Sequence, residues 1–152
     1  PFRGFLQQLG AAHDDGARTP PVVLMRGCRR SDHDTIYGDE IDRWVEQGWL
    51  QYFPAFSHEP GQDPKHVEDV IVEQADLLNP LLDADAKVLV CGDADQFYRD
   101  IEQTIIKVRT VDPATNAPVE AATAASDWLR LSKADGRYVV DIWAQPSSSA
   151  AG

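Results

Sequence analysis

The stretch that most constrains the fold covers residues 87–94 and reads KVLVCGDA. Three consecutive apolar residues at 88–90 follow an acidic loop and precede a Gly-Asp pair. This short, β-branched run predicts a buried parallel strand that is covered on both faces. A helical pattern begins directly afterwards, over 96–107. Ligands of open α/β sheets bind outside the carboxyl ends of the strands, so residues 91–94 form the first candidate site.

Strand-like runs alternate with helical patterns along the rest of the chain. Further strands are expected over 22–25, 50–57 and 138–143, and further helices over 1–9, 36–48, 67–78 and 121–133. Residues 31–34 offer N-caps for the second helix. Pro54 favours an edge position for its strand, and Pro80 should bend or end its helix. The alternation predicts the α/β class, with right-handed βαβ units in a doubly wound parallel sheet.

Composition narrows the classes of function. The 152 residues fit one domain, expected over 1–144, followed by a disordered tail over 145–152. A net charge of -11 disfavours a nucleic-acid binder and a membrane-surface protein, and no apolar run approaches the ~20 residues of a membrane-spanning helix. Cys28 and Cys91 lie far apart without metal-ligand spacing, which fits a reducing, cytoplasmic protein without a metal site.

Five short motifs occur in a characteristic order: PFRGF at 1–5, GCR at 27–29, FS at 56–57, CGD at 91–93 and GRYVVDIW at 136–143. Each motif alone is weak. Together they resemble the NADPH-binding module of diflavin reductases of the ferredoxin–NADP reductase type. That family includes NADPH–cytochrome P-450 reductase and fused, self-sufficient P-450 monooxygenase/reductases. The resemblance implies a Rossmann-like NADP(H)-binding domain over 1–144, belonging to an oxidoreductase and not expected to turn over alone.

The resemblance also implies roles for individual residues. The residues it places at the cofactor are Arg3, Cys28, Arg29, Ser57, His58, Lys65, His66, Glu68, Asp93, Asp100 and Trp143. Among these, Arg3 and Arg29 would lie near the pyrophosphate and ribose, and Asp100 near the adenosine. Ser57 and Lys65 would hold the 2′-phosphate.

A second implied group concerns hydride transfer. Cys91 and Asp93 would approach the nicotinamide, and Asp141 would join Cys91 in a proton and hydride network. Trp143 would stack over the flavin ring and move before nicotinamide docks. We therefore expect Cys91, Asp141 and Trp143 to be the catalytic residues.

Three positions depart from the family pattern. His58 stands where the family usually has arginine, His66 is nearest to its adenine-stacking tyrosine, and Glu68 replaces a glutamine. Imidazole is a weaker phosphate ligand than guanidinium, and a carboxylate repels phosphate. One lost charge-assisted contact is worth roughly 1.5–3 kcal/mol, or about ten- to hundredfold in affinity. The preference for NADPH over NADH should therefore be weaker than is usual in the family.

The resemblance further implies parts that lie outside this chain. A strand and a glycine-rich phosphate loop should directly precede Pro1, and that strand would occupy the middle of the sheet. Without it, strand edges would stay unpaired, so we expect either a piece of a longer polypeptide or a fragment that needs a partner to fold. The implied partners are FAD- and FMN-binding domains and a haem protein that accepts electrons.

Ordinary structural roles remain open for most of these residues. Cys28 and Cys91 fit inert buried thiols, Asp93 fits a helix cap, and Trp143 fits a core aromatic. The functional alternative is a dinucleotide-binding module without redox activity, in which the phosphate site has drifted and the choice between NADPH and NADH is relaxed.

Overall fold

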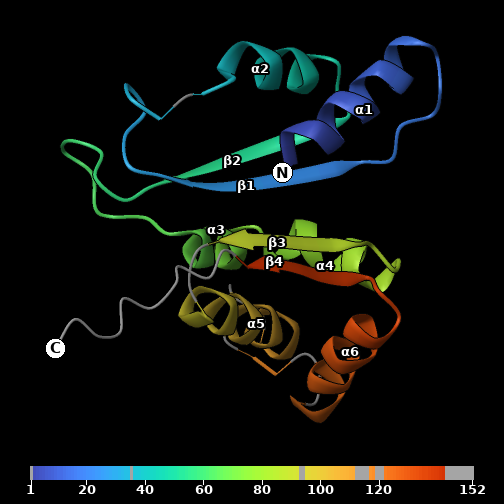
Figure 1. Cartoon of the computed structure of the whole chain (residues 1–152). Helices are drawn as coiled ribbons and strands as arrows, with labels where there is room; N and C mark the ends of the chain where they lie inside the picture. The colour runs from blue at the N-terminus through green and yellow to red at the C-terminus, as the bar shows by residue number, and fades with distance from the viewer. Residues whose placement is uncertain (1, 35, 93–94, 112–116, 119–121, 143–152) are drawn as a thin grey trace, which may run out of the picture. The chain divides into compact units, whose positions relative to one another are not determined.

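The computed structural model describes residues 2–34, 36–92, 95–111, 117–118 and 122–142, without the side chains of Asp95 and Ile142. Parallel strands alternate with helices, which confirms the predicted α/β class (Figure 1). The chain forms two compact units, 1–70 and 71–152. Each unit is described by itself. The boundary expected at 144 and the tail at 145–152 lie outside the described residues and stay predictions.

The first unit is a two-stranded parallel sheet with its first two helices on one side (Figure 1). Its elements are α1 (Phe2–Asp14), β1 (Val22–Cys28), α2 (Gly38–Glu46), β2 (Leu50–Phe56) and the start of α3 (Val67–Glu73). β1 and β2 pair in register from Val22 opposite Leu50 to Cys28 opposite Phe56. Both strands therefore end side by side at their carboxyl ends.

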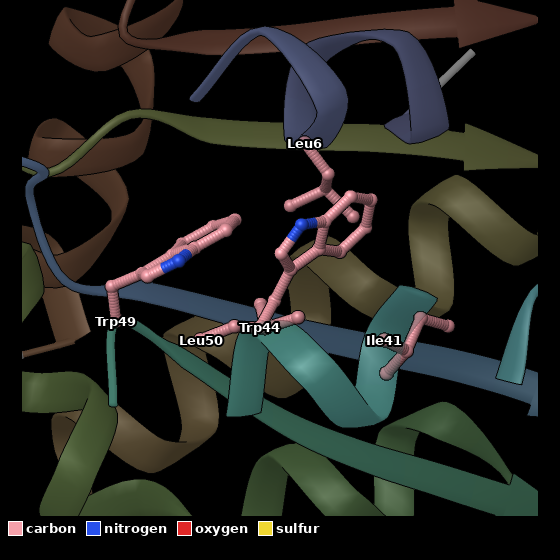
Figure 2. Close-up of a cluster of buried hydrophobic side chains, with 5 residues drawn as sticks. All are labelled: Leu6, Ile41, Trp44, Trp49 and Leu50. Carbon is pink, nitrogen blue, oxygen red and sulfur yellow. The ribbon is translucent and has the colours of Figure 1, made fainter. Parts of the chain in front are cut away.

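Tryptophan packing holds α1 and α2 against this sheet (Figure 2). The cluster consists of Leu6, Ile41, Trp44, Trp49 and Leu50, and the two indole rings lie 5.6 Å apart. Burying each side chain of this size stabilises the unit by about 1.5–3 kcal/mol. Helix α1 runs on through Gly10 to Asp14. A Cβ at Gly10 would lie 2.7 Å from the indole nitrogen of Trp44. The glycine lets the helix approach the ring closely.

The second unit holds the strand that the apolar run at 88–90 predicts. Its elements are α4 (Ala75–Asp83), β3 (Val88–Gly92), α5 (Asp95–Thr110), α6 (Ala122–Ala134) and β4 (Tyr138–Ile142). β3 and β4 are parallel, with Val88 opposite Tyr138 and Gly92 opposite Ile142. Helices α5 and α6 contact these strands, and Figure 1 shows both helices on one side of them.

The expectation that this central strand is covered on both faces is wrong for the described residues. Val90 and Tyr138 are buried, whereas Leu89 and Val139 are 41% and 44% exposed. Successive side chains of a strand point to opposite faces. The helices of this unit therefore bury the face that carries Val90 and Tyr138, and they leave the face with Leu89 and Val139 open.

Two helix boundaries also differ from the prediction. Helix α2 begins at Gly38, and its N-cap is Tyr37 in a left-handed conformation, so residues 31–34 do not cap it. The third helix breaks at Gln74 rather than at Pro80, and Pro80 lies inside α4. A proline removes one i→i−4 hydrogen bond. The new helix starts after Gln74 and continues to Asp83 although Pro80 removes one of its backbone hydrogen bonds.

Within the described residues, the strands form two separate pairs, β1–β2 and β3–β4, instead of one continuous sheet. β1 and β3 each have a strand neighbour on one side only there. β2 also has a single neighbour, which agrees with the edge position expected from Pro54. No helix of the described chain is long and apolar enough to cross a membrane.

Candidate functional site

Backbone pairing continues beyond the carboxyl ends of β1 and β2. The Ser57 amide donates to the Cys28 carbonyl, and the His58 amide donates to the Arg29 carbonyl, both at 2.9 Å. Arg29 is therefore held directly beside Ser57 and His58. This is the edge of a parallel sheet at which ligands of α/β folds bind.

The loop after β2 returns to the same edge. Its last residue, Lys65, donates its amide to the carbonyl of Phe56 at 2.9 Å. Within the loop, Ser57 Oγ lies 2.8 Å from His58 Nδ1, and the imidazole of His58 is exposed. Four residues singled out in the sequence, Arg29, Ser57, His58 and Lys65, thus meet at one place, which we call the β1–β2 edge.

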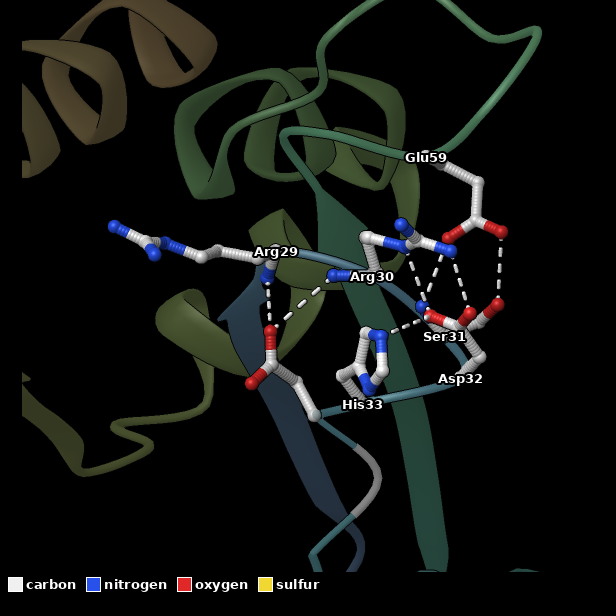
Figure 3. A network of polar contacts seen from close by, with 7 residues as sticks. Arg29, Arg30, Ser31, Asp32, His33 and Glu59 are labelled. Carbon is white, nitrogen blue, oxygen red and sulfur yellow. Dashed lines mark hydrogen bonds and ion pairs between the residues drawn. The ribbon is translucent and has the colours of Figure 1, made fainter.

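The two arginines after β1 differ in what they bind (Figure 3). The Arg30 guanidinium donates to Asp32, with 2.9 Å between Nε and Oδ1. The Arg29 guanidinium has no hydrogen bond or ion pair with any residue that the structure describes, and it extends away from the network. Arg29 is therefore the arginine that can accept an anionic ligand.

Carboxylates near this edge are already satisfied by the chain. Asp34 Oδ2 accepts hydrogen bonds from the amides of Arg29 and Arg30, at 2.6 and 3.2 Å. These amides hold the pKa of Asp34 well below its usual range. Glu59 accepts from both the amide and the hydroxyl of Ser31, at 2.8 Å each, and so ties the loop after β1 to the loop after β2 (Figure 3). These contacts order both loops.

Arg3 is engaged elsewhere in the first unit. Its guanidinium donates Nε and Nη2 to the two carboxylate oxygens of Glu40, at 2.8 and 3.0 Å. It also lies over the ring of Tyr37, 4.1 Å from the centroid. This pair lowers the pKa of Glu40. The implied contact of Arg3 with a pyrophosphate stays a prediction and would require Arg3 to share or leave Glu40.

Three other residues of the first unit have evident structural roles. Cys28 is buried at the end of β1, and burial raises the pKa of its thiol, so it stays protonated. His66 precedes α3, and its amide donates to Asp69 Oδ2 at 2.8 Å, which is one of the two hydrogen bonds of a capping box. Glu68 lies in the first turn of that helix. Their implied cofactor contacts are untested and stay predictions.

In the second unit, Cys91 and Asp141 are direct register partners across β3 and β4. Their side chains therefore leave the same face of the sheet, the face that also carries Leu89 and Val139. Cys91 is half-buried and Asp141 is exposed. The structure thus brings together the two residues that the resemblance joins in one network.

The remaining predicted residues of this unit are placed in part. Asp100 lies on α5, where its carboxylate accepts from Gln96 Nε2 at 2.7 Å. Its backbone carbonyl accepts from the hydroxyl of Thr104 at the same distance. Asp93 and Trp143 lie outside the described residues, so their predicted roles are untested.

Sequence reasoning missed three residues that organise these two sites: Asp34, Glu59 and Tyr98. The sequence pattern predicts a helix cap at Asp34, because this residue precedes a helical pattern. Glu59 carried no signal, since its partner Ser31 lies 28 residues away. Tyr98 could have been found, because it shares helical spacing with Ile101, and both are buried.

Comparison with known proteins identifies the family of this chain. Residues 1–103 match the oxidoreductase NAD-binding domain family. The chain is 33% identical, over 95% of its length, to bifunctional cytochrome P450/NADPH–P450 reductase 1 of Bacillus subtilis (strain 168), and covers 13% of that protein. It is 34% identical to the NADPH–cytochrome P450 reductase of Aspergillus terreus and 32% identical to that of Sus scrofa, over 94% of this chain and 20% of each relative. The chain therefore spans only a small part of these proteins.

Proposed function

This chain belongs to the oxidoreductase NAD-binding domain family, and from that premise we propose that it is the NADPH-binding module of a diflavin reductase. The observation that carries the proposal concerns Arg29, whose backbone lies beside Ser57 and His58 at the carboxyl ends of two parallel strands and whose guanidinium has no hydrogen bond or ion pair with any described residue. The similarity to NADPH–cytochrome P450 reductases over 94% of the chain supports it.

The donors at the β1–β2 edge fit a phosphorylated dinucleotide. A guanidinium can bind phosphate oxygens bidentately, so Arg29 would hold the pyrophosphate. The hydroxyl of Ser57 and the ammonium of Lys65 would contact the 2′-phosphate. The nearby carboxylates of Asp34 and Glu59 accept hydrogen bonds from amides and a hydroxyl, which reduces their repulsion of an anion.

The second unit would face the reactive end of the cofactor. The bound cofactors, NADPH and FAD, supply the hydride chemistry, with FMN as the next carrier. Cys91 offers a small, polarizable side chain beside the nicotinamide, and Asp141 sits next to it as a carboxylate. By resemblance, Asp93 and Trp143 would complete the site. The proposed partners are FAD- and FMN-binding domains of the same polypeptide and a haem protein in the cytoplasm.

The two neighbouring arginines provide the test. In the full-length gene product, we expect Arg29→Gln to weaken NADP⁺ binding about ten- to hundredfold, the value of one charge-assisted contact. Arg30→Gln is the matched control, because its guanidinium is already bound to Asp32, and it should change the affinity less than about threefold. Isothermal titration measures both. Equal effects of the two substitutions would contradict the assignment of Arg29.

The drifted, non-redox module is the second candidate, favoured by His58, His66 and Glu68 at positions of the phosphate site. A flavin-reduction assay on the full-length gene product separates the two candidates. A reductase bleaches its flavin absorbance on mixing with NADPH. If neither NADPH nor NADH bleaches it, the reductase proposal fails and the second candidate stands.

A further inference from the structure

A tyrosine hydroxyl joins the carboxyl ends of β3 and β4. Tyr98 lies in the first turn of α5 and is 5% exposed. Its oxygen accepts a hydrogen bond from the amide of Gly92 at 3.0 Å. The same oxygen lies 2.6 Å from the carbonyl of Asp141 and 3.0 Å from that of Gly92. The single hydroxyl hydrogen serves the nearer acceptor, so Tyr98 accepts from β3 and donates to β4.

The contact depends on a close approach between α5 and the end of β3. A Cβ on Gly92 would lie 2.5 Å from Cδ1 of Phe97, so only glycine leaves room for that ring. Phe97 and Tyr98 pack edge to face, with ring centroids 5.7 Å apart and planes at 72°. Both aromatic rings are therefore seated against the last residues of the strand.

Tyr98 reaches these strands without occupying the face that carries Cys91 and Asp141. Gly92 and Val90 alternate with Cys91 along β3, so they belong to the face that α5 and α6 cover. The side chains of Cys91 and Asp141 leave the opposite face. The hydroxyl bonds to the backbone of Asp141 itself and of Gly92, the residue after Cys91.

We propose that Tyr98 is a positioning residue that sets the spacing of Cys91 and Asp141 at the nicotinamide. The inference rests on the proposed function. It follows from the geometry because each strand of the pair is bonded to one and the same oxygen, which lies beside the paired residues. Shifts of about 1 Å in reacting groups can slow catalysis on the order of a hundredfold. A single hydroxyl that fixes this distance should therefore affect the rate more than the binding.

The test compares two buried tyrosines in the full-length gene product with its flavins bound. Tyr98→Phe removes the hydroxyl and keeps the ring. Tyr138→Phe is the matched control, since Tyr138 is equally buried and its hydroxyl has no hydrogen-bond partner among the described residues. Stopped-flow flavin reduction gives the hydride-transfer rate, NADP⁺ titration gives the affinity, and hydrogen exchange reports the amide of Gly92.

For Tyr98→Phe we expect the reduction rate at saturating NADPH to fall tenfold or more, while NADP⁺ affinity changes less than twofold. The Gly92 amide should exchange at least tenfold faster, because it loses its acceptor. Tyr138→Phe should leave all three quantities unchanged. Retained NADP⁺ affinity also shows that the variant is folded.

Two results would overturn the inference. If Tyr98→Phe leaves either the reduction rate or the Gly92 exchange at the wild-type value, Tyr98 does not position the pair. If the wild-type protein itself shows no flavin reduction, the proposed function fails and the role of Tyr98 falls with it. The wild-type trace therefore distinguishes the two failures.

Discussion

Ser57 Oγ and His58 Nδ1 lie 2.8 Å apart at the carboxyl end of β2. The proton on the imidazole decides the direction of this hydrogen bond. A charged ring donates to Ser57 Oγ and leaves the hydroxyl hydrogen for another acceptor. A neutral ring with a bare Nδ1 accepts that hydrogen instead. His58 therefore controls whether Ser57 can donate to a phosphate.

This relationship predicts that His58 affects the binding of NADPH more than that of NADH. His58→Ala removes the ring that lies 2.8 Å from Ser57 Oγ, so NADPH affinity should fall about tenfold, the value of one lost contact to a charged group. NADH lacks the 2′-phosphate, so its affinity should change much less. Titrations of both cofactors against the wild-type protein and the variant measure the difference. Equal changes for both cofactors would remove His58 from the site.

A related prediction restores the charge that the family usually carries at this position. His58→Arg should raise NADP⁺ affinity about tenfold or more, because a guanidinium adds a permanent charge-assisted contact to phosphate. Affinity for NAD⁺ should stay unchanged, which makes NAD⁺ the internal control. Isothermal titration with the two nucleotides checks the prediction. A parallel gain for both would mean that the new charge acts on the pyrophosphate.

Two glycines of α1 should respond oppositely to the same substitution. Alanine favours a helix over glycine by about 0.5–1 kcal/mol, and nothing lies within 4 Å of a Cβ at Gly4. Gly4→Ala should therefore stabilise α1. At Gly10 the new Cβ meets Trp44 Nε1 at 2.7 Å, and overpacking costs about 1–3 kcal/mol, so Gly10→Ala should destabilise. Native-state hydrogen exchange of the α1 amides measures both changes, and stabilisation by Gly10→Ala would contradict the packing.

Asp34 should make the loop after β1 sensitive to acid. The pKa of Asp34 in the folded protein is lowered, chiefly by the hydrogen bond from the Arg29 amide. The ionised carboxylate therefore stabilises the loop fully above the ordinary aspartate pKa of about 3.9. That effect is lost as pH falls through the lower folded pKa. The chemical shift of the Asp34 carboxyl carbon, followed by NMR as pH is lowered, should give a titration midpoint below 3.9. The amide signals of Arg29 and Arg30 should shift over the same pH range. Asp34→Asn should abolish that response, and a midpoint at or above the ordinary value would show that the two amides do not bind the carboxylate.

Two ion pairs of the second unit, one with a buried arginine and one with both side chains exposed, should differ in their effect on stability. The side chain of Arg109 is 8% exposed, bonds to Asp83 at 3.0 Å and lies over the ring of Trp128. Arg109→Ala should lower the opening free energy of α5 by about 1–3 kcal/mol. Arg130 pairs with Asp127 in solvent, so Arg130→Ala should change the opening free energy of α5 by about 0.5 kcal/mol or less. Hydrogen exchange of the α5 amides tests this, and similar values would contradict the role of burial.

Local patterns in the sequence were enough to predict the order and type of the elements. Short β-branched runs and helical spacing predict β1 to β4 and the helical segments, although not the break between α3 and α4, because both periodicities are properties of neighbouring residues. The edge position of β2 followed from Pro54, which cannot donate to a strand neighbour. The strand-like runs also place Arg29 and Ser57 close to strand ends, and in the structure these two residues directly follow β1 and β2.

The sequence by itself therefore determined the α/β class, the parallel strands and the strand-end positions of Arg29 and Ser57. Only the tertiary structure decided which arginine is available, because the pairing of Arg30 with Asp32 and of Arg3 with Glu40 depends on folded loops and helices. It also decided that Asp34 bonds to strand-end amides instead of capping α2, and that Tyr98 joins β3 to β4. Contacts such as that of Tyr98 with Asp141 join residues 43 positions apart. Their formation depends on packing, which no local pattern encodes.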